Sequence, residues 1–392
     1  MEKVKLHILP IIILSQFAAT SLWFAGNAIY PTLQTELGFS FEIAPQLTIA
    51  VQLGFILGTL LYAIFMIADR FSPSKVFLVS AILAALANML ILIPMPFWGI
   101  YASRLLTGFF LAGIYPVGMK IASDWFPRKL GNALGFLVAA LVLGTSFPHL
   151  IRFYSMDLPW KVVIITTSVI AVSGGLATAF LVGDGPHRKV SKQFSFSVFF
   201  KMFSNKMFNR ASFGYFGHMW ELYAFWAFLP AILTYISEQN EQYLNVSIWS
   251  FAIVAVGGVG SAVGGLYAKR FGSCRVAFFS MLMSALCALS FLFMANLSIN
   301  VIMALLFVWG FFVVADSPQF SSVIADYADK TLLGSALTIV NCIGFLITIL
   351  SIELMERLAS MGPTRFWILA IGPLLGLIPT GKIAFRKNFP AL

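Results

Sequence analysis

Twelve long apolar runs constrain the fold of this chain more than any other feature of its sequence. They lie at 8–31, 44–67, 75–95, 97–122, 131–152, 160–183, 211–236, 247–268, 275–295, 299–324, 333–356 and 364–385. A hydrocarbon core about 30 Å thick needs about 20 apolar residues in a helix that crosses it. Because a bilayer offers no water to backbone N–H and C=O groups, a run that crosses it must be helical. The sequence therefore predicts an all-α membrane protein with twelve transmembrane helices.

The composition excludes a soluble protein. Hydrophobic residues make up 60% and charged residues 10% of the chain, against about half and about a quarter in soluble domains. The net charge of +10 does not indicate a nucleic acid partner, because nearly all the charges lie between the apolar runs. The sequence shows no phosphate-binding glycine-rich loop and no nucleophile–His–acid set, so we expect no enzyme and no cofactor.

The positions of lysine and arginine predict how the chain crosses the membrane. If the N-terminus is cytoplasmic, twenty of the 25 lysines and arginines fall in cytoplasmic segments or adjoining helix ends. Four fall outside, and Arg104 lies within a run. Such an excess is typical of cytoplasmic loops. The pattern predicts both termini in the cytoplasm, and we expect the inner membrane of a bacterium.

The two halves of the sequence repeat. Four segments recur in order at an offset of about 200 residues: 68–75 at 268–275, 108–116 at 310–318, 124–125 at 326–327, and 131–134 at 334–337. The repeat predicts two six-helix bundles, 1–183 and 211–392, joined by a basic cytoplasmic linker at 184–210. Phenylalanines among the lysines of that linker fit an amphipathic helix on the membrane surface or a solvated linker.

The loop between the second and third runs carries a recognisable motif. Asp69-Arg70 followed by Lys75 resembles the loop signature of the major facilitator superfamily, Gly-x-x-x-Asp-Arg-x-Gly-Arg-Arg. This copy has Phe65 and Ser72 where the signature has glycines. The resemblance covers the whole chain, and it implies a transporter whose two halves rock about a shared cavity.

Other residues extend the resemblance. Arg104 followed by Gly108 resembles the Arg-x-x-x-Gly pattern of the same family, and the second copy of the loop has Lys269 in place of the acid. The resemblance implies that Asp69 and Arg70 form a conformational element, with Asp69 bracing a helix end. The alternative is that Asp69 is a turn residue tied to Arg70.

Polar residues at helical spacing predict a path through the membrane. On the first run, one face carries Gln16, Thr20, Trp23, Asn27 and Tyr30. Such a stripe is costly against lipid, so it indicates either a water-filled cavity or hydrogen bonds between helices. The predicted substrate-binding residues are Trp23, Asn27, Arg104, Tyr115, Trp226 and Asn341.

Buried ionisable residues predict how transport is driven. Arg104 needs an anion, a carbonyl cluster or water, and it is interpreted either as a ligand for an acidic substrate or as a structural ion pair. His218 and Glu221 are three apart and share a helix face. A carboxyl group in a low dielectric can hold a proton near neutral pH, so we expect Glu221 and His218 to carry the coupling proton. A fixed structural pair is the alternative, and Asp316 is a second proton carrier or a partner of Lys120 or Arg104.

These features predict a secondary active transporter of a small polar or anionic solute, coupled to protons and acting as a monomer in the bilayer. Uptake or exchange is favoured by the basic residues near the predicted path, which are Arg104, Lys120, His149 and His218. Efflux of amphipathic compounds is the alternative, favoured by the aromatic residues Trp23, Tyr115, Trp220 and Trp226. A metal-ion carrier is a third interpretation, because His-x-x-Glu occurs in metal sites of helical bundles, but four histidines in the whole chain argue against it and we predict no metal.

Overall fold

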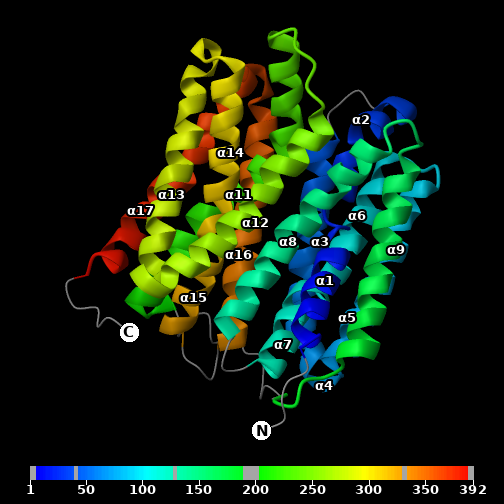
Figure 1. Ribbon diagram of the computed structural model, residues 1–392, viewed down its shortest axis with the longest axis vertical. Coiled ribbons are helices and arrows are strands. Elements are labelled where there is room, and N and C mark those ends of the chain that lie inside the picture. Colours follow the sequence, from blue (N-terminus) through cyan, green and yellow to red (C-terminus); the bar gives the residue numbers. More distant parts are fainter. Residues whose placement is uncertain (1–5, 39–42, 127–129, 189–202, 329–332, 387–392) are drawn as a thin grey trace. The chain divides into compact units, whose positions relative to one another are not determined.

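The structure is a computed structural model that describes residues 6–38, 43–126, 130–188, 203–328 and 333–386. Every regular element in these ranges is a helix (Figure 1). Within the same ranges, twelve helical segments are long and apolar enough to cross a membrane. The predicted all-α membrane fold with twelve spanning helices is therefore confirmed.

The first six spans come from the following helices: α1 (Ile8–Thr20) with α2 (Ala25–Leu37), α3 (Ala44–Ile64), α5 (Pro73–Met89) with the 3-10 turn Leu90–Leu92, α6 (Phe97–Leu111) with α7 (Tyr115–Trp125), α8 (Leu130–Tyr154), and α9 (Lys161–Ala177) with the π-turn Thr178–Val182. A short helix, α4 (Ile67–Arg70), lies in the loop between the second and third spans.

The last six spans come from a second series of helices: α11 (Lys206–Gln239), α12 (Val246–Phe271), α13 (Ser273–Ser290) with the 3-10 turn Phe291–Asn296, α14 (Ile299–Ala315) with α15 (Ser317–Tyr327), α16 (Leu333–Arg357), and the 3-10 segment Ala359–Ala370 with α17 (Ile371–Ala384). The linker residues 189–202, where an amphipathic helix was one of two predictions, lie outside the described residues.

Two spans are interrupted at equivalent places of the repeat. Between α6 and α7 the chain leaves the α-helix just before Pro116, and between α14 and α15 it does so just before Pro318. Proline lacks the N–H that would continue the helix and clashes with the preceding turn. Asp316 is the residue at which the two half-helices α14 and α15 meet.

The first span is also interrupted, and the sequence does not predict it. α1 ends at Thr20 and α2 begins at Ala25, with a turn between them. Prolines do not cause this break, because the proline of α2, Pro31, lies beyond the turn. The break places the carbonyls that end one half-helix and the N–H groups that begin the next within the membrane-spanning segment.

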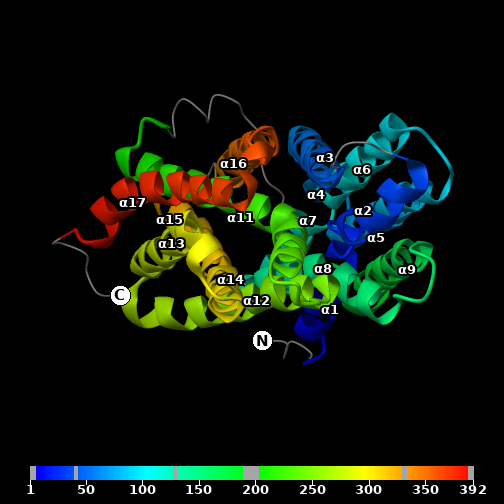
Figure 2. The same ribbon diagram turned by 90° about the horizontal axis from the view of Figure 1, so that it is seen from above.

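Glycines bring α3 and α6 into close contact, and the two helices lie side by side (Figure 2). A β carbon on Gly108 would lie 1.9 Å from the carbonyl oxygen of Val51, and one on Gly54 would lie equally close to that of Leu105. The second half repeats the arrangement between α12 and α14, where a β carbon on Gly260 would lie 2.1 Å from the carbonyl oxygen of Phe311. Small residues that let backbones approach are typical of packed transmembrane helices.

The chain divides into two compact units. One comprises Met1–Phe194 with Ala227–Ala255, and the other comprises Ser195–Trp226 with Val256–Leu392. Helices α11 and α12 each contribute residues to both units. The division into bundles 1–183 and 211–392 with a linker stays a prediction.

Candidate functional site

In the first unit, Arg104 on α6 forms hydrogen bonds with the backbone at the break between α1 and α2. Its side chain is fully buried. One terminal nitrogen, Nη2, donates to the carbonyl oxygens of Leu22 and Trp23 at 2.8 and 2.7 Å. These carbonyls follow the end of α1 and have no partner within that helix, so the cation satisfies the groups that the break exposes. Of the three possibilities that the sequence left open for Arg104, the structure shows a carbonyl cluster.

Asn88 on α5 fixes the other side of the guanidinium. Its Oδ1 accepts a hydrogen bond from Nη1 of Arg104 at 2.7 Å, and its Nδ2 donates to Ser168 of α9 at 3.0 Å. All the hydrogen-bond acceptors of Arg104 are therefore neutral. In the described part of the chain, Arg104 forms no ion pair with a carboxylate.

Other residues predicted to bind substrate lie near the same break. The ring of Trp23 packs against Phe55 of α3, with ring centroids 4.9 Å apart. Asn27 is buried and donates from Nδ2 to the hydroxyl of Thr48 at 2.8 Å, which ties α2 to α3. Tyr115 begins α7 and is partly buried. Trp23, Asn27 and Arg104 thus surround one feature of the fold, the broken first span.

In the second unit, His218 of α11 contacts Asp316 at the break between α14 and α15. His218 Nδ1 lies 2.8 Å from Asp316 Oδ1, and both side chains are almost fully buried. Rings of Tyr215 and Phe320 flank the imidazole at about 6 Å. The sequence suggested that His218 shares a proton with Glu221, whereas the structure joins it to Asp316.

Glu221 lies one helical turn from His218 in a different environment. Its carboxyl group is buried and accepts a hydrogen bond at 2.5 Å from the indole N–H of Trp309 on α14. The hydroxyl of Ser284 on α13 lies beside the same carboxyl. Among the described residues, Glu221 forms no ion pair with a lysine, arginine or histidine.

The remaining predicted residues of the second unit lie on α11 and α16. Trp226 is buried, and its ring packs against Tyr223 with centroids 5.2 Å apart. Asn341 on α16 is partly buried. Within the described ranges, no group of three or more His, Cys, Asp or Glu side chains is placed to hold a metal ion. That these residues and those of the first unit face one substrate cavity stays a prediction.

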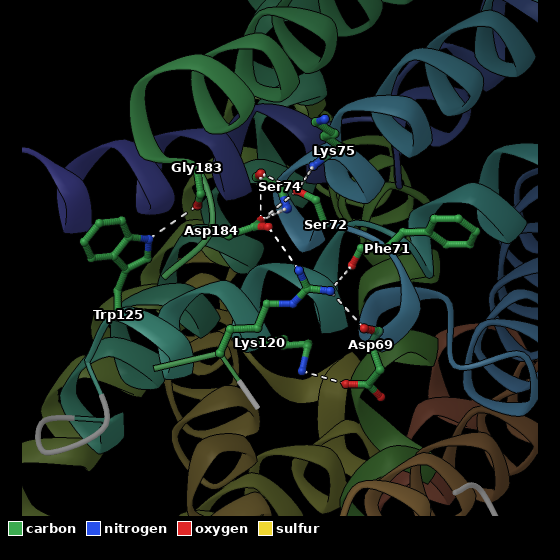
Figure 3. A network of polar contacts seen from close by, with 10 residues as sticks. Asp69, Phe71, Ser72, Ser74, Lys75, Lys120, Trp125, Gly183 and Asp184 are labelled. Atoms are coloured by element: carbon green, nitrogen blue, oxygen red, sulfur yellow. Dashed lines mark hydrogen bonds and ion pairs between the residues drawn. The ribbon is translucent and has the colours of Figure 1, made fainter. Parts of the chain in front are cut away.

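A second polar cluster surrounds the loop that carries the family signature (Figure 3). Lys120 of α7 forms an ion pair with Asp69 at 2.8 Å. Arg188, which follows the sixth span, donates from Nη2 to the carbonyl oxygens of Asp69 and Phe71 at 2.9 and 2.7 Å. The acid of the signature therefore contacts α7 of its own unit, whereas Arg70 is exposed. That Asp69 braces a helix end as a conformational element stays a prediction.

Asp184 is the acceptor at the other end of this cluster. Its Oδ1 accepts hydrogen bonds from the hydroxyls of Ser72 and Ser74 at 2.8 and 2.9 Å and from the backbone N–H of Ser74 at 3.1 Å. Arg188 contacts the other oxygen at 3.4 Å. Burial alone would raise the pKa of Asp184, but the hydrogen bonds and the guanidinium outweigh it, so the pKa lies below its ordinary value. The loop is thereby tied to the end of the sixth span.

Several residues of these two clusters could not be identified from the sequence. The sequence pattern does not identify Asn88 or Trp309, and it places Asp184 and Arg188 only in the predicted basic linker. A signal existed for Asn88, which is an amide within an otherwise apolar run. For Trp309 the signal was weaker, because a tryptophan in a transmembrane helix is common.

Polar and ionisable groups are thus buried at helix breaks within segments that are long and apolar enough to span a membrane. The chain matches the Major Facilitator Superfamily over residues 12–387 and belongs to that family. It is therefore a transporter and not an enzyme.

Two similar proteins have printed functions. A gentisate transporter of Corynebacterium glutamicum is 26% identical over 132 residues, which are 33% of this chain and 29% of that protein. The match thus spans less than a third of that relative. The crystal structure of the human organic anion transporter MFSD10 (TETRAN) has a TM-score of 0.72 at 15% identity, covering 95% of this chain and 99% of that one. This second likeness supports the fold alone.

Proposed function

We propose that this transporter moves a small organic anion by alternating access and couples its movement to protons. The observation that carries the proposal is the buried acid–base group of the second unit, formed by the His218–Asp316 pair and by Glu221. Ionisable side chains within spanning segments are costly and mark ion or proton pathways. A proton on Glu221 removes a buried charge, so loading and release of that proton changes the stability of the surrounding helices.

The choice of an anionic substrate rests on the first unit. Arg104 is a buried cation with neutral partners, so an anion that reaches it gains a strong electrostatic interaction. The name of the similar bacterial protein points the same way, since gentisate is an aromatic carboxylate.

The proposed working arrangement follows from the repeat and from the charges. Bundles 1–183 and 211–392 rock about a shared substrate cavity, and a single copy of the chain is sufficient. Both termini lie in the cytoplasm and the protein resides in a bacterial inner membrane, as the excess of lysine and arginine in alternate loops supports. The Asp69–Lys120 pair supports a conformational role for Asp69, because it joins the signature loop to the end of the fourth span.

Gradient-driven uptake tests the proposal. The purified protein is reconstituted in liposomes, and uptake of labelled gentisate is measured with and without an imposed pH gradient. We expect the gradient to stimulate uptake by the wild type and to have no effect on Glu221→Gln. The matched control is Glu353→Gln, which changes an exposed carboxyl paired with Arg357 on the same helix.

Two results would count against the proposal. If the imposed pH gradient does not change the rate of uptake by the wild type, the proposal of proton coupling is wrong. If Glu221→Gln responds to the gradient as strongly as Glu353→Gln does, Glu221 does not take part in coupling. The His218–Asp316 pair would then be the proposed coupling site.

A further inference from the structure

An open groove lies at the C-terminal end of α8, within the first unit. Its volume is about 400 Å³, which is in the range of sites for small ligands. Its wall is largely hydrophobic, since four of the lining residues are Phe147, Leu150, Ile151 and Tyr154. The fifth, Ser155, is buried, and its hydroxyl group forms no hydrogen bond within the described structure. The groove therefore combines an apolar wall with one unpartnered polar group.

The groove opens on the exposed side of α8. In the described part of this helix, the exposed side chains are those of Phe136, Leu143 and Tyr154. Steps of seven and eleven residues place them on one helical face, and Leu150 falls on the same face. All of them are apolar or aromatic, as expected for a face against hydrocarbon, where polar side chains are costly. Lipid chains are therefore the surroundings of the groove in a membrane.

The end of the groove has the features of a membrane–water interface. Tyr154 is 79% exposed, and tyrosine is enriched at the level of the lipid headgroups. Arg152 lies on the same turn, and its Nη1 is 3.4 Å from the carbonyl oxygen of Ser155. Long basic side chains also place their charge at this level. A lipid chain in the groove would therefore have its headgroup beside Arg152.

The guanidinium of Arg152 forms no ion pair among the described residues, although the exposed acid Asp157 is close in sequence. Its Nη1 donates to the carbonyl oxygens of Ser155 and Leu158 at 3.4 Å, and its Nη2 donates to the hydroxyl of Thr32 at 3.3 Å. These acceptors are neutral, and the distances exceed the range of about 2.7–3.2 Å for ordinary hydrogen bonds. Hydrogen bonds from arginine to an anion are shorter and stronger. The guanidinium can therefore bind a phosphate without losing a strong contact.

We propose that the groove at the end of α8 binds an anionic phospholipid. One acyl chain lies along Phe147 and Leu150. The phosphate accepts hydrogen bonds from Arg152, and the hydroxyl of Ser155 donates to an oxygen of the same lipid. An anionic lipid is favoured over a zwitterionic one because it has no ammonium group that competes with the guanidinium for the phosphate. The site uses none of the proposed substrate or coupling residues, so its test is independent of the proposed function.

Native mass spectrometry of the purified, delipidated protein tests the headgroup contact, with dioleoyl phosphatidylglycerol and dioleoyl phosphatidylcholine as probes. We expect the wild type to bind one phosphatidylglycerol about tenfold more tightly than one phosphatidylcholine, as for a hydrogen bond between charged groups. In Arg152→Gln we expect phosphatidylglycerol binding to fall about tenfold, to the level of phosphatidylcholine. The matched control is Lys161→Gln, which removes an exposed charge at the start of α9 and should keep the preference.

A second pair of variants tests the apolar wall. Leu150→Trp places a larger side chain in the groove, so both lipids should bind about fourfold more weakly or worse, the value for one CH₂ group that is no longer buried. The matched control is Leu143→Trp, on the same exposed face of α8 but outside the lining of the groove. It should leave the binding of both lipids unchanged.

Four results would overturn the site. They are equal binding of the two lipids by the wild type, equal phosphatidylglycerol binding by Arg152→Gln and Lys161→Gln, equal lipid binding by Leu150→Trp and Leu143→Trp, and a dimer mass that Leu150→Trp removes. The last would show that a second copy of the chain covers the groove. The first needs no variant, so the test holds even if a variant is unstable.

Discussion

A methyl group at position 108 would test the contact between α3 and α6, which positions Arg104. The β carbon of an alanine there would lie 1.9 Å from the carbonyl oxygen of Val51, whereas a carbon and an oxygen in close contact are about 3.3 Å apart. The atom it meets belongs to the backbone and cannot rotate away, so the helices must separate. Overpacking of this kind costs about 1–3 kcal/mol, and we expect Gly108→Ala to cost about 3 kcal/mol because the backbone itself must move.

Thermal unfolding of the purified protein in detergent measures this cost. A loss of about 3 kcal/mol should lower Tm by about 6 °C or more. The control is Gly265→Ala on α12, where an added β carbon has no neighbour within 4 Å. Alanine is favoured over glycine in a helix by about 1 kcal/mol, so this variant should be as stable as the wild type or more so. Equal Tm values for Gly108→Ala and Gly265→Ala would refute the close contact of α3 with α6.

Three further predictions concern the polar clusters. Trp309→Phe keeps a ring against Phe225 but removes the N–H that Trp309 donates to the buried carboxyl of Glu221, so it should cost about 1 kcal/mol of stability in thermal unfolding. Trp309→Ala also removes the ring and should cost about 3–5 kcal/mol, and equal losses for the two variants would contradict this prediction. Because the folded pKa of Asp184 is lowered, its stabilisation is present above the unfolded pKa, about 3.9, and is lost as the pH falls through the folded pKa. The Tm difference between wild type and Asp184→Asn should therefore be largest near neutral pH and shrink below about pH 4; a constant difference would contradict it. A double-mutant cycle with Asp69→Asn and Lys120→Met should give a coupling energy of about 0.5–1 kcal/mol that decreases at high salt. A coupling energy of zero would show that the two side chains do not form a stabilising ion pair.

The twelve spans could be predicted from the sequence because length and hydropathy alone decide whether a helix can cross a bilayer. The break before Pro318 was also predictable, since proline removes a helical hydrogen bond and clashes with the preceding turn. The break between α1 and α2 was not, because the sequence there contains no proline and its cause is tertiary. Arg104, far along the chain, binds the carbonyls of Leu22 and Trp23 that the break exposes.

Part of the candidate site could likewise be predicted from the sequence, and part could not. Burial of Arg104, His218 and Glu221 followed from their positions inside apolar runs, and the structure confirms that all three are buried. Their partners did not follow, because a helical face gives neighbours three or four residues away but not those on other helices. His218 therefore seemed to belong with Glu221, three residues along, whereas its contact is with Asp316, almost a hundred residues away.

Proton movement caused by the substrate tests the central claim most directly. Liposomes containing the protein enclose a pH-sensitive dye, and gentisate is added outside with no pH gradient imposed; liposomes without protein correct for passive entry of the acid. We predict a change in internal pH that depends on the wild-type protein, persists in Glu353→Gln and is absent in Glu221→Gln. Protein-dependent entry of gentisate with no protein-dependent change in internal pH would contradict the account.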